Sequence, residues 1–453
     1  MPTSSSLIGK IIIAMLASVI IGFPLSMGGA NSLVSSLLIF GLLLFLFCLR
    51  LSYFKLVQVM IVVLFFLPFQ YLTFLNIFNA INPLTFVGSV LLIKAFRDKV
   101  MYNAGPLSLK TNTIDKLYYF FLFSAFISTG FANSKLGALN WIYYSIVTGY
   151  IPFKIITYFD RKELIKIFRT LVLLGAICAL EGIGEYVLKR SILFPVFPGR
   201  FTSLLGHPLV NGLIFSILLP LCLLIYLWTK EKRFICYSII FFIAIILTQA
   251  RGSWVAWVSG LVFVLLMVPV RVKIRFIIVV ILVSAIIAVV PLLRNTLTSR
   301  AREYEGQKYS SWNVRLKSIP VAVEILKDKP FFGGGPFNAG RYKDEYSTDF
   351  TLRKTAFENS YLGLLVDFGI LGFFLLFSIF AVVILRVVLA TRSHMPHGSA
   401  MYLVLWSLII MCINMATFNF DSYRSFSFVV WLFMALFFAF VASGEKGSIS
   451  EIS

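Results

Sequence analysis

Long apolar runs recur along this chain and constrain its fold more than any other feature of the sequence. Each run is close to the roughly 20 residues that an α-helix needs to cross the hydrocarbon core of a bilayer. The runs begin near residues 8, 33, 56, 81, 117, 137, 164, 208, 234, 252, 275, 361, 399 and 424. The sequence therefore predicts an all-α, polytopic helical membrane protein with about 14 transmembrane helices.

The composition agrees with a membrane protein. Hydrophobic residues make up 59% of the 453 residues and charged residues only 13%, whereas soluble domains have about 25% charged residues. The formal net charge of +21 would suggest nucleic-acid binding in a soluble protein. In a membrane protein, basic residues collect in the cytoplasmic loops. We therefore expect the lipid bilayer, and no nucleic acid, among its partners.

Lysine and arginine alternate with the predicted spans. With the N-terminus in the cytoplasm, basic residues fall in every second loop, as Lys230, Lys232 and Arg233 do. The short loops around residues 24–32 and 71–80 carry no lysine or arginine. This alternation follows the positive-inside rule and predicts that both termini are cytoplasmic.

Three parts follow from this topology. Residues 1–293 are predicted to hold transmembrane helices 1 to 11, and residues 361–453 to hold helices 12 to 14 with a short cytoplasmic tail. Residues 294–360 form one large extracytoplasmic loop with twelve Lys or Arg and eight Asp or Glu. Loops of this length are commonly functional.

The long loop is predicted to be partly helical. Leu316, Ile319, Val323 and Leu326 recur at helical spacing, which indicates a helix that lies against the membrane or the helical bundle. The glycine-rich run of residues 331–337 then predicts a turn.

Arginines mark the predicted outer side. Arg251 starts a span and is either an interfacial anchor or a phosphate clamp, because a guanidinium donates two parallel hydrogen bonds. Gly252 beside it lets a ligand approach the backbone. Arg200 lies in the outer segment 184–207. Arg315 lies in the long loop, where a solvated surface charge is the alternative.

Two further candidate functional residues lie at the starts of predicted helices. His207 precedes a proline and is either a structural hydrogen-bonding residue or a catalyst. Glu358, followed by Asn359, stands just before a span, where a carboxylate complements a helix N-terminus or acts as a general base. Gly369 and Gly372 are interpreted as close-packing positions between helices.

Several kinds of site have no signature in this sequence. There is no P-loop, no HExxH, no GxSxG and no Cys/His metal spacing, so neither a metal nor a cofactor is predicted. The outer arginines with one histidine and one glutamate suit the binding of a pyrophosphate and the deprotonation of a hydroxyl.

The order of these motifs resembles the O-antigen ligase and O-antigen polymerase superfamily of bacterial membrane glycosyltransferases. The resemblance lies between residues 195 and 380, in the stretches Arg200–Asn211, Gln249–Trp254, Arg315, Asp328–Gly335, Glu358–Leu362 and Gly369–Gly372. Many members of the superfamily have histidine where this chain has Glu358. This departure favours a polymerase over a ligase.

The resemblance implies an inner-membrane polymerase that joins undecaprenyl-pyrophosphate-linked repeat units during O-antigen, capsule or exopolysaccharide synthesis. It implies metal-independent, inverting transfer at an extracytoplasmic active site. Its partners would be a lipid-linked glycan donor, a glycan acceptor, a flippase and a chain-length regulator. The residues that would bind the pyrophosphate are Arg200, Arg251 and Arg315. The catalytic residues would be Glu358 and Arg251, supported by His207, Asn359 and Gly252.

Other functions remain open at this point. A ligase would transfer the glycan to lipid A core or to a protein. A lipid-linked oligosaccharide transporter or a non-enzymatic assembly factor is the alternative from another class. The spans are largely free of charged residues and show no internal repeat, and both features disfavour a transporter.

Overall fold

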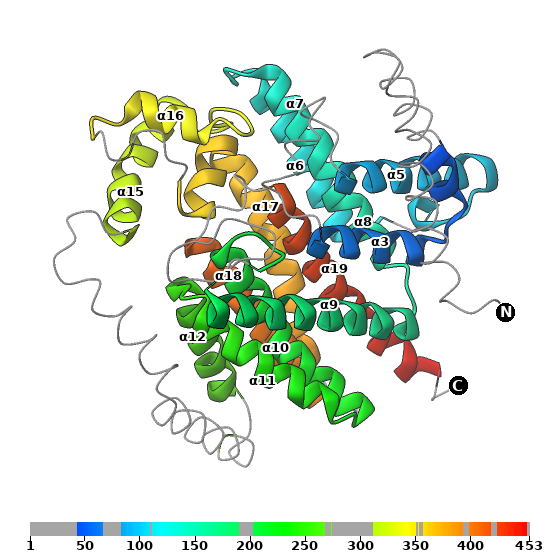
Figure 1. The fold of residues 1–453 in the computed structure, drawn as a ribbon. Helices are drawn as coiled ribbons and strands as arrows, with labels where there is room; N and C mark the ends of the chain where they lie inside the picture. Colours follow the sequence, from blue (N-terminus) through cyan, green and yellow to red (C-terminus); the bar gives the residue numbers. More distant parts are fainter. Residues whose placement is uncertain are drawn as a thin grey trace, which may run out of the picture. The chain divides into compact units, whose positions relative to one another are not determined.

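The computed structural model describes residues 43–66, 83–108, 111–189, 203–267, 273, 311–349, 352, 357–392, 398–417 and 424–450. Most of these residues are helical, with no β-strand among them (Figure 1). The chain divides into two compact units, Met1–Leu56 and Val57–Ser453. The described part of the first unit is a helix over residues 43–50 and the beginning of α3. All contacts discussed below lie within the second unit.

The helices keep the labels of Figure 1. They are α3 (Tyr53–Phe66), α5 (Pro83–Tyr102), the 3-10 helix η2 (Pro106–Ser108), α6 (Thr113–Thr129), α7 (Lys135–Tyr144), the π-helix η3 (Ser145–Tyr150), α8 (Ile151–Ile156), α9 (Arg161–Leu188), α10 (Pro208–Thr229), α11 (Arg233–Leu247), α12 (Arg251–Met267), α15 (Ser311–Asp328), α16 (Ala339–Tyr346), α17 (Ser360–Arg392), α18 (Gly398–Thr417) and α19 (Arg424–Ser450).

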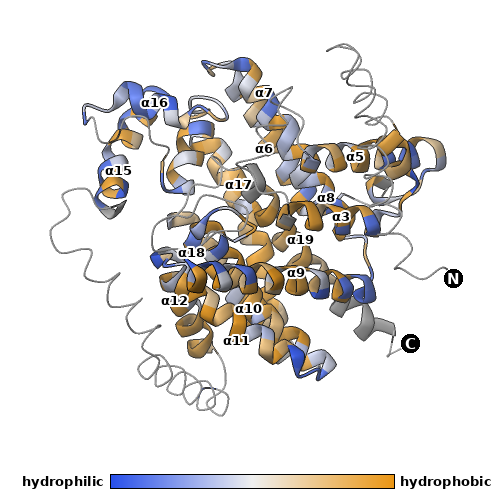
Figure 2. Ribbon diagram, viewed as in Figure 1, coloured by the Kyte–Doolittle hydropathy of each residue, from blue (hydrophilic) through white to orange (hydrophobic). Residues whose placement is uncertain are grey.

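The helices are apolar enough for a membrane protein. Arg161–Leu188, Pro208–Thr229 and Ser360–Thr391 are each long and apolar enough to cross a bilayer, and several shorter helices are also apolar. Figure 2 shows hydrophobic residues along α10, α11 and α17 and hydrophilic ones on α16. The predicted runs near residues 8, 33 and 275 begin outside the described residues. The total of about 14 spans stays a prediction.

Small residues bring the helices of the bundle close together. A Cβ added at Gly260 of α12 would lie 2.6 Å from the indole ring of Trp406 in α18. That indole donates a hydrogen bond of 3.1 Å to the carbonyl of Trp257. Close approach through glycine is typical of membrane helices, which gain their stability from packing and not from hydrophobic burial alone.

The long helix α17 is broken at Gly369, where φ is +65° and ψ is −171°. In an unbroken helix the carbonyls of Val366 and Asp367 would accept from the amides of Ile370 and Leu371, four residues on. The break separates these two pairs. It leaves two carbonyls and two amides inside a membrane helix without their helical partners.

The glycine-rich run after α15 supplies the missing partners. The amides of Gly334 and Gly335 donate to the carbonyls of residues 366 and 367 at 2.8 and 2.9 Å. The amides of residues 370 and 371 donate to the carbonyls of Pro330 and Phe331 at 2.8 and 3.2 Å. Unsatisfied backbone groups are costly in a membrane, so this exchange makes the break tolerable.

This exchange of backbone hydrogen bonds requires glycine both in the run after α15 and at the break in α17. A Cβ at Gly333, where φ is +67°, would lie 2.4 Å from the carbonyl oxygen of Val366. A Cβ at Gly369 would lie 2.4 Å from the carbonyl oxygen of Phe331. The interpretation of Gly369 as a close-packing position between helices is therefore wrong, because this glycine breaks α17 and receives a loop. At Gly372 a Cβ would lie 3.4 Å from Ser124 Oγ of α6, as expected for a helix contact.

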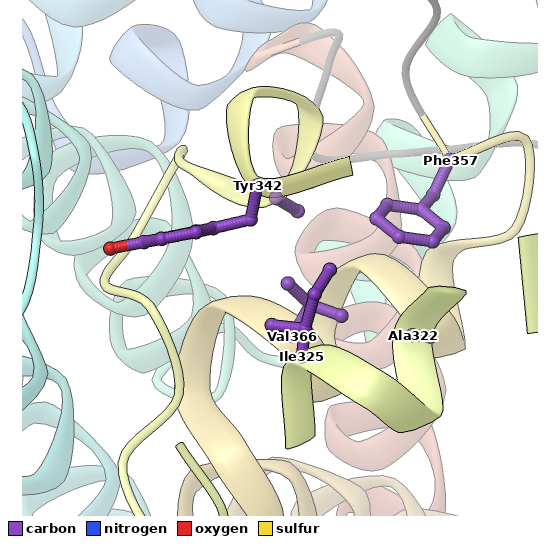
Figure 3. Packing of buried hydrophobic residues seen from close by; sticks show 6 residues of the cluster. Ala322, Ile325, Tyr342, Phe357 and Val366 are labelled. Atoms are coloured by element: carbon purple, nitrogen blue, oxygen red, sulfur yellow. The ribbon is translucent and has the colours of Figure 1, made fainter. Parts of the chain in front are cut away.

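A small apolar core ties the long loop to α17. It joins Ala322 and Ile325 of α15, Tyr342 of α16, Phe357 and Val366, all buried (Figure 3). The prediction of a helix in this loop is confirmed by α15.

The face of α15 that packs against the rest of the protein differs from the face that the apolar residues from Leu316 to Leu326 predicted. Leu316, Ile319 and Val323 are 44–48% exposed, whereas Ala322 and Ile325 on another face are buried. Those three residues therefore do not pack against the described part of the bundle, and contact with the membrane stays a prediction.

We predict that Gly369→Ala destabilises the protein by more than about 2 kcal/mol, because alanine is strained at positive φ and its Cβ meets the loop. Thermal unfolding of the purified protein in detergent measures this. Gly184→Ala in α9 is the matched control, since a Cβ there meets nothing within 4 Å. Equal melting temperatures for the two variants would contradict the account of the break.

Candidate functional site

Arg315 joins three segments that are far apart in the sequence. Its Nε donates to the carbonyl of Glu358 at 3.2 Å, and its Nη2 lies 3.1 Å from the Glu358 carboxylate. The same Nη2 donates to the carbonyl of Thr417 at 2.9 Å. The Arg315 side chain is 20% exposed and that of Glu358 is 42% exposed. Arg315 thus connects α15, the segment before α17 and the last residue of α18, and it remains accessible.

The start of α12 lies beside Thr417, the residue that Arg315 binds. A Cβ added at Gly252 would lie 2.3 Å from Thr417 Oγ1, so the α12 backbone touches the residue that Arg315 binds. Arg251, the first residue of α12, is half-buried directly beside this contact. The structure therefore brings Arg251, Gly252, Arg315 and Glu358 to one end of the bundle.

A sharp turn fixes Arg251 at that end. Gln249, between α11 and α12, has a φ of +53°, and Thr248 Oγ1 accepts from the amide of Ala250 at 3.3 Å. Trp254 Nε1 donates back to the carbonyl of Ile245 at 2.8 Å. These contacts hold α11 and α12 as a hairpin with Arg251 at its bend.

Polar contacts attach the start of α12 to its neighbours. Ser253 Oγ lies 3.0 Å from Asn414 Oδ1 of α18, and both residues are buried. A Cβ added at Gly212 of α10 would lie 2.6 Å from Ser253 Oγ. The N-terminal parts of α10 and α12 therefore lie side by side.

His207 caps α10. Its Nδ1 accepts from the amide of Leu209 at 3.2 Å, which satisfies one of the open amides at the helix start. Burial lowers the pKa of His207 to about 4, so the imidazole is neutral at physiological pH. This bond gives His207 the structural role that the sequence left open, and a catalytic role stays a prediction.

Two glutamates hold the segment that leads to His207. Glu185 accepts from the amide of Ser203 at 2.9 Å, and Glu181 from the amide of Leu204 at 3.0 Å. Both belong to α9, which continues to Leu188, so residues 184–188 of the predicted outer segment are helical. Arg200 lies outside the described residues.

Asn359 caps α17. Its Oδ1 accepts from the amides of Tyr361 and Leu362 at 2.9 and 3.3 Å, as expected of an asparagine before a helix. This cap fixes the backbone on which Glu358 is presented.

Lys343 of α16 is a member of the site that the sequence analysis missed. It is fully buried, and its Nζ lies 5.2 Å from the ring centroid of Phe357. Burial lowers its pKa, while the charges of Glu358 and Asp344 raise it. No sequence signal separates Lys343 from the other basic residues of the long loop.

Asp367 of α17 was also missed. Its carboxylate accepts from the amides of Phe337, Asn338 and Ala339 at 3.0, 3.0 and 2.6 Å. A carboxylate there stabilises the N-terminus of α16, and so fixes the helix that carries Lys343. An aspartate within an otherwise apolar helix is a signal that could have identified it.

This arrangement suits an anionic ligand. Arg315 and Lys343 lie near the Glu358 carboxylate, with Asp344 beside Lys343, and Arg251 begins α12 at the same end of the bundle. Two of the three cations are arginines, which bind phosphate oxygens through paired hydrogen bonds. In the described part of the chain no group of three His, Cys, Asp or Glu residues could hold a metal ion. The chemistry open to these side chains is charge stabilisation and proton transfer.

We predict that Asp367→Asn loosens α16 and costs about 1–3 kcal/mol, because an amide group cannot accept from all three backbone donors. Thermal unfolding and proteolysis within residues 330–349 would both report the change. The control is Asp349→Asn, which breaks the exposed pair with Lys317 and should cost less than about 1 kcal/mol. Equal protease resistance of both variants would contradict this role.

We also predict that His207 makes the protein less stable in acid. Because its folded-state pKa is lowered from 6.5 to about 4, the unfolded chain binds more protons between these values. Stability should therefore fall by on the order of 2 kcal/mol as the pH drops from 6.5 to 4. His207→Asn keeps a capping side chain and removes this titration. Parallel melting curves against pH for both proteins would contradict the prediction.

The chain was compared with known protein families and with curated proteins. Residues 236–377 match the family model described as O-antigen ligase. The matched region contains Arg251, Gly252, Arg315, Lys343 and Glu358, and it ends within α17. No curated protein matches the chain. The resemblance predicted from the motifs is confirmed.

Proposed function

Because residues 236–377 match the family model described as O-antigen ligase, we propose that this protein is a membrane glycosyltransferase, a polysaccharide polymerase of the bacterial inner membrane. It would join undecaprenyl-pyrophosphate-linked oligosaccharide repeats on the extracytoplasmic face. The observation that carries the proposal is the ion pair of Arg315 and Glu358, with Lys343 and the start of α12 beside it.

The proposed reaction is a single displacement. A hydroxyl of the acceptor glycan attacks the anomeric carbon of the donor sugar, and the bond from that carbon to the pyrophosphate oxygen breaks. Undecaprenyl pyrophosphate leaves with the electron pair, while the hydroxyl proton passes to Glu358. One displacement inverts the anomeric configuration. Arg251 and Arg315 stabilise the charge that develops on the leaving group, a role that needs no metal.

The contacts of Arg315 suit this role. Its guanidinium is oriented by the carbonyls of Glu358 and Thr417 and by the Glu358 carboxylate. Donors held in place before the substrate binds need no reorganisation during the reaction, which is the main source of electrostatic catalysis. In the proposed site Arg200 would add a further pyrophosphate contact.

The ligase alternative differs in the acceptor, which would be lipid A core or a protein. The site geometry is compatible with both acceptors. Glu358, in the place where many ligases have histidine, supports the polymerase.

One observation bears on the transporter alternative. Asp115 and Lys154 form a buried ion pair of 2.5 Å within the helices, and ionisable residues inside membrane helices often mark transport pathways. Here the aspartate also accepts from Tyr150 and from the amide of Asn112, in a capping box at the start of α6. These bonds close the network at a helix end, which supports a structural role for the pair.

We predict that Arg251→Ala lowers polymer formation at least about 100-fold, the usual effect of removing one transition-state donor. Cells whose only copy carries the variant should still make lipid-linked single repeats. Arg251→Lys should retain part of the activity, because lysine keeps the charge but loses the paired hydrogen bonds. Gel analysis of the glycan and extraction of lipid-linked sugars would measure both.

The control is Arg341→Ala, which removes an arginine that is 63% exposed and pairs with Glu345 one helical turn away. Membrane expression of each variant is checked by immunoblot. Full-length polymer with Arg251→Ala would overturn the proposed role of this residue. Lipid-linked polymer that is made but not transferred would identify a ligase.

A further inference from the structure

Seven basic residues lie in two segments that meet at one end of the bundle. Residues 160–169, at the start of α9, hold four of them, and residues 229–233, between α10 and α11, hold three. Arg169 Nη2 lies 2.6 Å from Glu231 Oε1, which joins the two segments. The guanidinium of Arg161 lies over the ring of Trp228, 5.5 Å from its centroid. Together with Trp228, these segments form the basic junction.

The three carboxylates of the basic junction are already engaged by the protein. Asp160 Oδ1 accepts from the amide of Glu163 at 2.7 Å, and Glu163 Oε2 accepts from the amide of Asp160 at 3.2 Å, in a capping box at the start of α9. Glu231 pairs with both Arg169 and Arg233. The side chains of these two arginines are 41% and 58% exposed. One carboxylate between two guanidiniums leaves a positive charge that a ligand can reach.

Two donors of the basic junction are buried without an acceptor. Trp228 Nε1 and Arg169 Nε have no hydrogen-bond partner within the part of the chain that the structure describes. Buried donors are nearly always paired, with protein, with water or with a bound ion. A guanidinium and an indole N–H at one junction both require an oxygen acceptor, and a phosphate group presents several oxygens at once.

The basic junction lies at the opposite end of α10 from the candidate site. With 22 residues, α10 is about 33 Å long, close to the roughly 30 Å of a hydrocarbon core. Its start lies beside the start of α12, where Arg251 stands. Both α9 and α10 are long and apolar enough to cross a bilayer. The basic junction therefore belongs to the other membrane surface, which the positive-inside rule predicts to be cytoplasmic.

An exposed apolar face of α9 leads away from the basic junction. Leu173, Ile177 and Leu180 are 50%, 40% and 53% exposed. They follow Arg169 by four, eight and eleven residues, which is the spacing of a single helix face. A soluble anion would not contact this apolar face. An amphiphile would place an anionic head at Arg169 and an apolar chain along the face below it.

We propose that the basic junction binds the phosphate headgroup of an anionic phospholipid, with one acyl chain along the exposed face of α9. Basic pockets between membrane helices suit such headgroups. Arg169 and Arg233 donate to the phosphate oxygens. The indole N–H of Trp228 donates to a headgroup oxygen, as is common for tryptophan at a membrane surface. This lipid site is separate from the proposed transferase site and does not depend on it.

The test uses the delipidated full-length protein in a neutral detergent. The protein is titrated with dioleoylphosphatidylglycerol and, separately, with dioleoylphosphatidylcholine, and native mass spectrometry counts the bound lipid and gives a Kd. We expect phosphatidylglycerol to bind at least about tenfold more tightly, because only its headgroup carries a net negative charge. Inorganic phosphate is the third probe, and it should not displace the lipid, because it lacks the apolar chain.

A pair of double variants locates the headgroup. Arg169→Gln together with Arg233→Gln should weaken phosphatidylglycerol binding at least about tenfold. The matched control is Lys317→Gln together with Lys327→Gln, which also removes two positive charges. These lysines lie on α15 and are 53% and 63% exposed, so this control should bind the lipid as the unaltered protein does.

A second pair of variants tests the indole. Trp228→Phe keeps an aromatic ring and removes the N–H, and it should weaken phosphatidylglycerol binding about fivefold. Trp257→Phe is the matched control, because Trp257 Nε1 in α12 is also buried without a partner in the described residues but lies outside the basic junction. The control should leave the Kd unchanged.

Three results would overturn the proposal. An equal Kd for the two lipids would mean that the headgroup is not recognised. An unchanged Kd in both the double arginine variant and Trp228→Phe would place the lipid elsewhere. Displacement of the lipid by inorganic phosphate would identify a site for a soluble anion. Because Trp228→Phe leaves the ion pairs of Glu231 in place, the test stands even where the double arginine variant fails to fold.

Discussion

The exchange of backbone hydrogen bonds between the glycine-rich run and the break in α17 is the interaction on which the rest of the site depends. Four backbone groups of a membrane helix take their partners from residues 330–335. Because these groups have no water to bind in a bilayer, the loop cannot leave without a large cost. The exchange therefore attaches the long loop to the bundle at a fixed register.

The positions of the charged residues follow from this attachment. Asp367, within the broken turn, holds the start of α16, and α16 carries Lys343 to Glu358. The apolar core around Ile325 fixes α15, which carries Arg315. Two cations from a polar loop are thus held against the ends of membrane helices. A loop of this length would otherwise be too mobile to place donors for catalysis.

Much of this arrangement could be predicted from the sequence, because it depends on local patterns. Apolar runs predicted the helices, and motif order singled out Arg251, Arg315 and Glu358, of which Arg315 and Glu358 form an ion pair. The break at Gly369 was not predictable, because hydropathy continues through it and the deciding contact comes from residues some 35 positions earlier. Lys343 was missed for the same reason: its burial depends on packing against Phe357. The face of α15 was misjudged because Ala322 packs and the larger Leu316 does not.

A single glycine, Gly369, lets the long loop bind to α17. Were α17 straight, Tyr361 and Phe373 would lie about 18 Å apart along the helix, whereas their ring centroids are 6.5 Å apart. The glycine-rich run would then have no open backbone groups to bind, and Asp367 would not reach the start of α16. The charged residues of the loop would lose their attachment to the bundle. This dependence gives a reason for an otherwise costly break in a membrane helix, in which four backbone groups take their partners from the loop.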